Sequence, residues 1–253
     1  MPEIDVAERD GVGLDGRRRP SEDRVVVLDH AVAVIDGATS ADPELPSGGW
    51  YAERLAAQLT SALHGDADLR TVLRSAISGV ARDEGLAPGR SPSSTVAMAR
   101  WTPDHVDLLV LADSPIVAFG QTTEVVADDR LVTLRRAGKL RTHDAVRALR
   151  NSPGGFWVAE ADPDAADHAL TRTLPRRHLE ALILATDGVS CGVDDYDLFT
   201  WPEALRLARA QGAAAVLDAV RAAEESDPRG TRWPRVKRHD DQAMALVSFS
   251  GAP

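Results

Sequence analysis

The chain has 253 residues, of which 43% are hydrophobic, and 39 acidic against 29 basic residues give a formal net charge of −10. This length suffices for one large or two small domains, and the acidic balance argues against generic nucleic-acid binding, which needs a basic footprint. No apolar run approaches the roughly 20 residues that cross a bilayer, and the polar, acidic start MPEIDVAERDGVG is not a secretory signal. The single cysteine, Cys191, excludes an internal disulfide and indicates a reducing, cytoplasmic setting.

The first part of the chain predicts a hairpin followed by two helices. The runs DRVVVLDH and AVAVIDG are rich in Val and Ile and are separated by a polar Asp29-His30 step, which is typical of a β-hairpin. Apolar residues then recur at helical spacing over residues 49–63 and 66–83. The segment EGLAPGRSPSS, rich in Gly, Pro and Ser, predicts a loop.

Strands dominate the next part of the chain. STVAMARW, HVDLLVLAD, PIVAFG and TEVVAD follow one another with short connections, which favours antiparallel pairing. Residues 141–175 predict a short helix broken at Pro153, a strand-like start, a turn and a weak helix. ALILATDG predicts a buried strand, residues 201–226 a helical region interrupted at Gly212, and QAMALVSFS a closing strand. Because helices must cover the outer sheet faces, we predict an α+β sandwich in a single domain over residues 1–253.

Four aspartates stand at the edges of predicted strands: Asp36 in AVAVIDGATS, Asp113 in LLVLADSPIVAF, Asp187 in LILATDGVS and Asp241 in RHDDQAMALVSF. If these strands pack side by side, the carboxylates converge, and their crowding is costly unless a cation neutralises them. Oxygen donors without nearby Cys or paired His suit Mg²⁺ or Mn²⁺ rather than Zn²⁺. An Asp-Gly step alone is more often a turn. The apolar lead-ins VAVIDG and LILATDG favour a shared metal cluster instead.

These motifs, in this order, resemble the metal-dependent protein phosphatases of type 2C over nearly the whole chain. Arg18 with Glu22-Asp23 resembles the opening arginine and Asn-Glu-Asp element of that family, with Ser21 in place of Asn. The family's Asp-Gly, Gly-Ser/Thr-Thr, Gly-Asp-Ser, Ser-Asp-Gly and terminal Asp-Asn motifs find counterparts in Asp36-Gly37, Ser93-Ser94-Thr95, Ala112-Asp113-Ser114, Thr186-Asp187-Gly188 and Asp241-Gln242.

The resemblance implies a four-layer α/β/β/α sandwich of two antiparallel sheets flanked by helices. It also implies two Mg²⁺ or Mn²⁺ ions at the sheet ends, with Asp36 bridging both. Asp187 and Asp241 would complete one ion, while the carbonyl of Gly37 and a water held by Glu22 would serve the other. Two such cations can activate a shared water and stabilise the charge of an in-line phosphoryl transfer.

The resemblance further implies that Asp113 helps to hold a weaker third ion and that Arg18 binds the substrate phosphate. Without the resemblance, the run Arg17-Arg18-Arg19 is a solvated loop. The implied activity is hydrolysis of phosphoserine or phosphothreonine on proteins by a water that bridges two metal ions. The implied partner is a phosphorylated protein, and we expect a monomer that binds neither nucleic acid nor membrane.

Three features depart from the family pattern. Ala38 stands where the family often has the His that protonates the leaving group, which leaves a metal-bound water or His239 for that role. Asp240 is an alternative to Asp241 as the last ligand. The segment between Ala127 and Pro175, where the family shapes its substrate site, has little resemblance. Two other functions stay open: a non-catalytic phosphatase-like binding module, and a hydrolase of small phosphate compounds.

Overall fold

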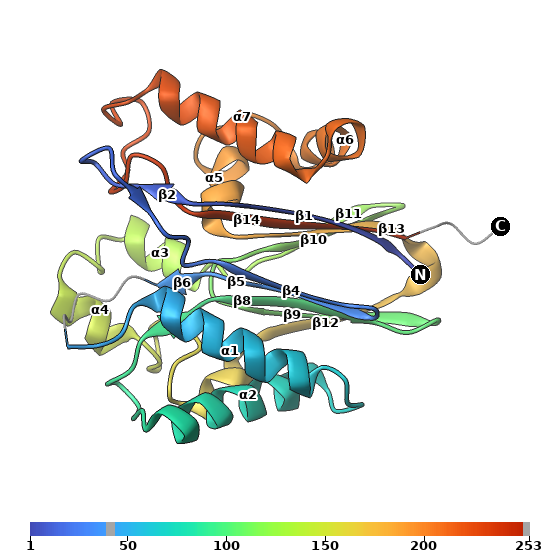
Figure 1. The fold of residues 1–253 in the computed structure, drawn as a ribbon, viewed down its shortest axis with the longest axis horizontal. Helices are drawn as coiled ribbons and strands as arrows, with labels where there is room; N and C mark the ends of the chain where they lie inside the picture. The colour runs from blue at the N-terminus through green and yellow to red at the C-terminus, as the bar shows by residue number, and fades with distance from the viewer. Residues whose placement is uncertain (39–43, 250–253) are drawn as a thin grey trace.

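Two five-stranded antiparallel sheets lie face to face in a computed structural model that describes residues 1–38 and 44–249 (Figure 1). The first sheet has the order β1 (Glu3–Arg9), β14 (Gln242–Ser248), β13 (Leu179–Ala185), β10 (Ile116–Gly120) and β11 (Thr123–Val126). The second has the order β12 (Leu170–Pro175), β9 (His105–Leu111), β8 (Val96–Trp101), β5 (Ala31–Ile35) and β4 (Arg24–Leu28). Short antiparallel pairs join β2 (Gly11–Val12) to β3 (Arg18–Arg19) and β6 (Gly37–Ala38) to β7 (Ser93–Ser94).

Helices cover both outer faces of this pair of sheets (Figure 1). The second sheet packs against α1 (Gly48–Ala62) and α2 (Leu69–Glu84). The first packs against α5 (Asp187–Asp194), α6 (Trp201–Gln211) and α7 (Ala213–Ser226). Between β11 and β12 lie α3 (Arg130–Arg136), α4 (His143–Leu149) and the 3-10 turn η1 (Pro163–His168), and η2 (Arg176–His178) joins β12 to β13. The predicted four-layer α+β sandwich is confirmed. None of the described helices is long and apolar enough to span a bilayer.

Strand β5 shows how the layers are held together. It is buried along its whole length, because its two faces serve different cores. Val32 and Val34 pack between the sheets with Leu182 of β13, whereas Ala33 and Ile35 pack against α1 and α2. Full burial of each large aliphatic side chain contributes about 1.5–3 kcal/mol. The run AVAVI is therefore continuously apolar, as the sequence pattern predicts for a central strand.

Local signals in the sequence fix the helix ends. Asp68 precedes α2 and accepts hydrogen bonds from the first-turn amides, and Gly85 ends that helix with a φ of 65°. The predicted interruption at Gly212 is confirmed, since this residue separates α6 from α7. The first amide of α7, that of Ala213, donates to the carboxylate of Asp5, 2.6 Å away on β1. This contact ties the helical layer to the edge strand of the first sheet.

One end of the sandwich collects the strand termini that carry the predicted carboxylates. In the second sheet, β5 and β9 both run antiparallel to β8 and therefore end at the same edge, where Asp36 and Asp113 follow them. In the first sheet, β13 and β14 are antiparallel neighbours, so Asp187 after β13 lies at the same edge as Asp241 before β14. The topology thus places carboxylates from both sheets at the same end of the sandwich.

Candidate metal centre

The carboxylates from the two sheets lie within each other's electrostatic reach. Burial, followed by the negative charges of Asp23, Asp187, Asp240 and Asp113, raises the pKa of Asp36 well above its ordinary value. Asp36 and Asp113 come from the second sheet, whereas Asp187 and Asp240 come from the first. At this end of the sandwich, carboxylates from both sheets therefore form one cluster of like charges.

Thr95 holds the backbone of Asp36. Its amide donates to Oγ1 of Thr95 at 3.3 Å, and its carbonyl accepts from the amide of Thr95 at 2.9 Å. The hydroxyls of Thr95 and Ser114 lie 2.6 Å apart. Ser114 follows Asp113, so this chain of contacts couples the positions of two candidate ligands. Ala112 precedes them with a φ of 68°, a conformation that glycine adopts at lower cost.

Asp187 occupies the first position of α5. Burial first, and then the charges of Asp240 and Asp113, raise its pKa from 3.8 to about 7, although Arg135 and Lys237 act in the opposite direction. A carboxylate at a helix N-terminus gains from the helix dipole, so the raised pKa shows how strongly burial and its acidic neighbours oppose its charge.

Asp23 belongs to the cluster, although the sequence analysis assigned it no role. Its side chain is 1% exposed, and Oδ2 accepts a hydrogen bond from the hydroxyl of Thr186 at 2.9 Å. Oδ1 has no hydrogen-bond partner among the described residues. Burial first, with the charges of Asp241 and Asp187 adding to it, raises its pKa well above the ordinary value. In the sequence, the feature that could have identified Asp23 is its position between Glu22 and the first residue of β4.

Asp240 and Asp241 make different contacts. Oδ2 of Asp241 accepts the amide hydrogen of Glu22 at 2.7 Å, and a Cβ added at Gly11 would overlap its Oδ1. Asp241 thereby holds the loop before β4 in place. Asp240 is instead among the charges that raise the pKa values of both Asp36 and Asp187. Asp241 is among the charges that raise the pKa of Asp23, and its buried Oδ1 has no hydrogen-bond partner among the described residues.

The glycines of the two Asp-Gly steps are required by backbone packing. A Cβ at Gly37 would lie 2.5 Å from the carbonyl carbon of Gly48, at the start of α1. A Cβ at Gly188 would overlap the carbonyl oxygen of Asp241. Glu22 lies at the same junction as Gly37: its carbonyl accepts the Gly37 amide at 3.2 Å, and its carboxylate accepts the Gly49 amide at 3.1 Å.

Two basic side chains enter the cluster. Nζ of Lys237 lies 2.6 Å from Oδ1 of Asp240, and a guanidinium nitrogen of Arg135 on α3 lies 3.2 Å from Oδ2 of Asp113. Burial opposes the charge of Lys237, yet Asp240 and its acidic neighbours hold its pKa above the ordinary value. The chain therefore supplies part of the positive charge that the carboxylates require.

Arg18 is placed beside the cluster by the β2–β3 hairpin. It pairs with Val12, and Val12 exchanges backbone hydrogen bonds of 2.8 and 3.0 Å with His239, the residue before Asp240. Arg17 and Arg19 both approach Asp15. Arg18 is exposed and forms no ion pair with a described residue.

His239 is a structural residue. Its ring is 4% exposed, and Nδ1 lies 2.7 Å from a carboxylate oxygen of Glu224 on α7. Burial first, and then the charges of Arg221 and Arg238, lower its pKa to about 4. The contact with Glu224 binds the ring to α7, which does not support His239 as a proton donor to a leaving group.

The donor chemistry of the cluster fits a hard divalent cation. All the converging side chains are carboxylates, they raise one another's pKa values, and a buried oxygen of Asp23 has no partner within the described ranges. In residues 1–38 and 44–249, no three His, Cys, Asp or Glu side chains are grouped tightly enough to hold an ion as they stand.

Comparisons with known proteins identify the family and relatives of the fold. Residues 19–221 match the sequence profile of the family described as Protein phosphatase 2C, whereas no curated protein matches the sequence. A bacterial serine phosphatase structure is similar with a TM-score of 0.64 and 14% identity, with 100% of both chains covered. The structure of serine/threonine phosphatase Stp1 from Staphylococcus aureus is similar with a TM-score of 0.62 and 14% identity. The match covers 99% of this chain and 96% of that chain.

A third similar structure is the catalytic domain of the serine threonine protein phosphatase PstP in complex with two manganese ions. It gives a TM-score of 0.59 and 16% identity, covering 98% of this chain and 99% of its own. At identities this low, these structures establish likeness of fold alone.

Proposed function

Because this chain belongs to the protein phosphatase 2C family, we propose that it is a metal-dependent phosphatase acting on phosphoserine and phosphothreonine in proteins. The observation that carries the proposal is the convergence of carboxylates from both sheets, which raises the pKa of Asp36 through four acidic neighbours. Such a cluster gains most from divalent cations. We further propose that it binds two Mg²⁺ or Mn²⁺ ions, with a third at Asp113. We also propose that the enzyme is monomeric and cytoplasmic; a single cysteine, Cys191, fits the reducing cytoplasm.

The residues that would hold the cations are Asp36, Glu22, Asp113, Asp187, Asp240 and, through its carbonyl, Gly37. We propose Asp240 in place of Asp241, which the sequence analysis preferred. Oδ2 of Asp241 accepts the Glu22 amide hydrogen, and Oδ1 is buried beside Gly11 and has no hydrogen-bond partner among the described residues. Asp240 lies next to Asp36 and Asp187, and its carboxylate is 38% exposed and so accessible to an ion.

Arg18 would bind the phosphate of the substrate. Its guanidinium can hold two phosphate oxygens at once, and it forms no ion pair with a described residue. Bound divalent cations would supply activation of the attacking water and neutralise the charge of the transferred phosphoryl group. Since the methyl side chain of Ala38 has no proton to donate and His239 is bound to Glu224, we assign protonation of the leaving oxygen to solvent.

Turnover of p-nitrophenyl phosphate and of a phosphoserine peptide, with Mn²⁺ and with excess chelator, tests the proposal. We expect turnover with Mn²⁺, loss of turnover with chelator and resistance to serine-directed covalent inhibitors, because the nucleophile is water. Full activity in excess chelator contradicts the proposed metal site. A preference for small phosphate metabolites over phosphopeptides contradicts the proposed substrate class, and binding of phosphopeptides without hydrolysis identifies a non-catalytic module.

A further inference from the structure

One segment of this acidic protein is strongly basic. Residues 130–150 contain seven Arg and Lys residues and a single acidic residue, Asp144, whereas the whole chain carries a net charge of −10. The segment includes α3 and α4. A local charge opposite to that of the molecule creates a field that attracts a partner of the complementary sign.

The basic segment lies at the carboxylate end of the sandwich. Figure 1 shows α3 and α4 beyond the ends of the strands, on the side away from the N-terminus. The contact between Arg135 of α3 and Asp113, 3.2 Å apart, joins the segment directly to the candidate metal centre. A polypeptide whose phosphorylated residue reaches the cluster would therefore pass this segment.

Most of the basic side chains of the segment form no ion pair with a described residue. Arg130 is bound by Asp128, and Arg150 lies 3.6 Å from Glu160. Four exposed side chains form no ion pair with any described residue: Arg136, Lys139, Arg141 and Arg147. We call these four residues the cationic surface.

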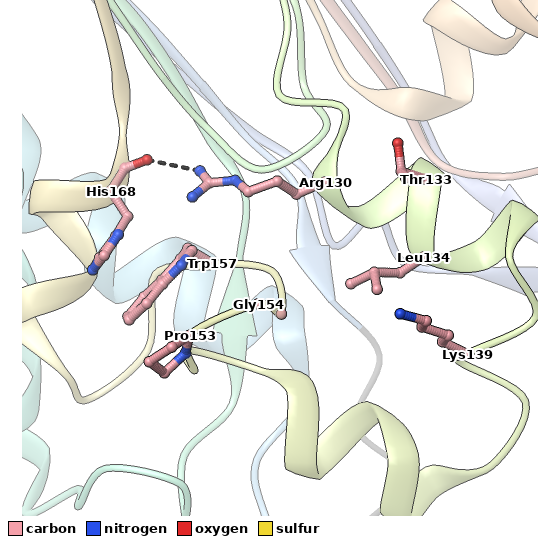
Figure 2. Close-up of a pocket in the computed structure, with 9 residues that line it drawn as sticks. Arg130, Thr133, Leu134, Lys139, Pro153, Gly154, Trp157 and His168 are labelled. Carbon is pink, nitrogen blue, oxygen red and sulfur yellow. Dashed lines mark hydrogen bonds between the residues drawn. The ribbon is translucent and has the colours of Figure 1, made fainter.

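A pocket of about 560 Å³ adjoins the cationic surface. Its apolar wall includes Leu134, Pro153 and Trp157, and the Trp157 ring stacks on His168 with 3.4 Å between the ring centroids. Figure 2 shows the Leu134 side chain and the Lys139 ammonium reaching into the pocket. The pocket thus offers an apolar floor with a cation at its rim.

We propose that the cationic surface and this pocket dock the residues that flank the phosphorylated residue, and that they select acidic segments carrying an apolar side chain. The inference rests on the proposed function, since the phosphorylated residue must lie at the carboxylate cluster. An extended peptide spans about 3.3 Å per residue, so a few flanking residues reach from the cluster across α3. A nucleic acid would extend past the cationic surface onto an otherwise acidic molecule and would leave the apolar pocket unfilled.

Two phosphoserine peptides with the same central sequence, one with acidic and one with neutral flanks, test the proposal. The wild-type protein should show the higher kcat/KM for the acidic peptide. The double variant Lys139→Glu/Arg141→Glu should lower the ratio of the two kcat/KM values by about tenfold, because like charges then face each other. Raising the ionic strength should reduce the wild-type ratio as exposed charges are screened.

The matched control is Arg177→Glu/Arg206→Glu, which changes the net charge equally. Arg177 follows β12 at the end opposite to Asp113, because Pro175 pairs with His105 at the start of β9. Arg206 lies on α6 with an exposed side chain. The control should keep the wild-type ratio. An unchanged ratio in the test variant, or an equal fall in the control, overturns the proposal.

A second measurement separates this proposal from the proposed function. Fluorescence anisotropy of a labelled acidic peptide in chelator reports docking without turnover. Weaker binding to Lys139→Glu/Arg141→Glu than to the wild-type protein supports the surface, even if p-nitrophenyl phosphate is not hydrolysed and the proposed function fails. Tight binding of a DNA duplex that the variant loses, together with an unchanged peptide ratio, would assign the surface to nucleic acid and overturn the proposal. Arg147→Glu provides an independent variant on α4.

Discussion

The ammonium of Lys237 lies 2.6 Å from Oδ1 of Asp240, so a cation of the chain itself neutralises a carboxylate that we assign to the metal. A metal ion must therefore compete with a tethered ammonium. The same side chain lowers the pKa of Asp187, which extends its influence across the cluster. Lys237 is thus placed to set the metal affinity without being a ligand.

Replacing Lys237 by Met should tighten Mn²⁺ binding by about fivefold, because a partly exposed ion pair of this kind contributes up to about 1 kcal/mol. The chelated variant should melt at a lower temperature than the wild-type protein, since the carboxylates lose a counter-charge. Titration calorimetry and thermal melting in chelator measure the two effects. Lys139→Met, the same change outside the cluster, is the control. Weaker Mn²⁺ binding in Lys237→Met would contradict this account.

Asp36→Asn should reduce metal affinity and turnover together, by at least the roughly 10- to 100-fold that losses around a metal ligand produce. The chelated variant should be as stable as the wild-type protein or more stable, because one of the charges facing Asp23 and Asp187 is removed. Asp187→Asn should behave similarly. A turn aspartate would tolerate Asn with little effect. Metal-dependent turnover at the wild-type rate in Asp36→Asn would contradict the assignment of Asp36 as a metal ligand.

Asp240 and Asp241 should respond differently to substitution. Asp240→Asn should weaken Mn²⁺ binding, whereas Asp241→Asn should largely retain it, because an amide oxygen can still accept the Glu22 hydrogen bond. Asp241→Ala leaves that buried amide without its acceptor and should cost about 1–3 kcal/mol of stability. Calorimetric Mn²⁺ titrations and urea unfolding separate these effects. The reverse pattern, with Asp241→Asn losing the metal, restores the sequence-based choice.

The stability of the chelated protein should fall as the pH rises from about 4 to about 7. Burial and acidic neighbours raise the pKa of Asp187 from 3.8 to about 7. A carboxyl group with a higher pKa in the folded than in the unfolded chain stabilises the fold below its unfolded pKa, and this contribution is lost as the pH passes the folded value. Metal affinity should rise over the same window, since the ligands must be deprotonated. Melting curves in chelator that are flat across the window would refute this.

Arg18→Ala should raise the Michaelis constant and leave Mn²⁺ affinity nearly unchanged, because the guanidinium would touch phosphate and not metal. Arg17→Ala is the matched control within the same arginine run, and its side chain approaches Asp15 instead. Steady-state kinetics with p-nitrophenyl phosphate, and Mn²⁺ titration of both variants, measure the difference. Equal Michaelis constants in the two variants would show that Arg18 does not bind the substrate phosphate and is an ordinary solvated side chain.

The fold could be predicted from the sequence where strands are buried. The runs that form β5, β8, β9, β13 and β14 are apolar because both of their faces are covered. Strands β1 and β12 were not predicted. They are edge strands with largely exposed side chains, EIDVAER and LTRTLP, and so carry no hydrophobic pattern. Helix α5 was hidden because it begins within the Asp-Gly motif itself.

The site could be predicted only as a set of strand ends. The sequence indicated that carboxylates follow buried strands, but the contacts that orient them join distant positions. The amide of Glu22 and the carboxylate of Asp241 are 219 residues apart, and the hydroxyl of Thr186 reaches Asp23 across 163. Neither contact has a local signature. The choice between Asp240 and Asp241 therefore depends on tertiary structure.

The division of the carboxylates between the two sheets means that neither sheet contains the centre. Asp36 and Asp113 belong to one sheet, and Asp187 and Asp240 to the other, with the buried layer around Val32 and Leu182 between them. The carboxylates of the two sheets come together only where this layer holds the sheets against each other, so the complete cluster depends on the packing between the sheets. If the two sheets were separated, each would carry only its own two carboxylates, and neither pair would form the complete cluster.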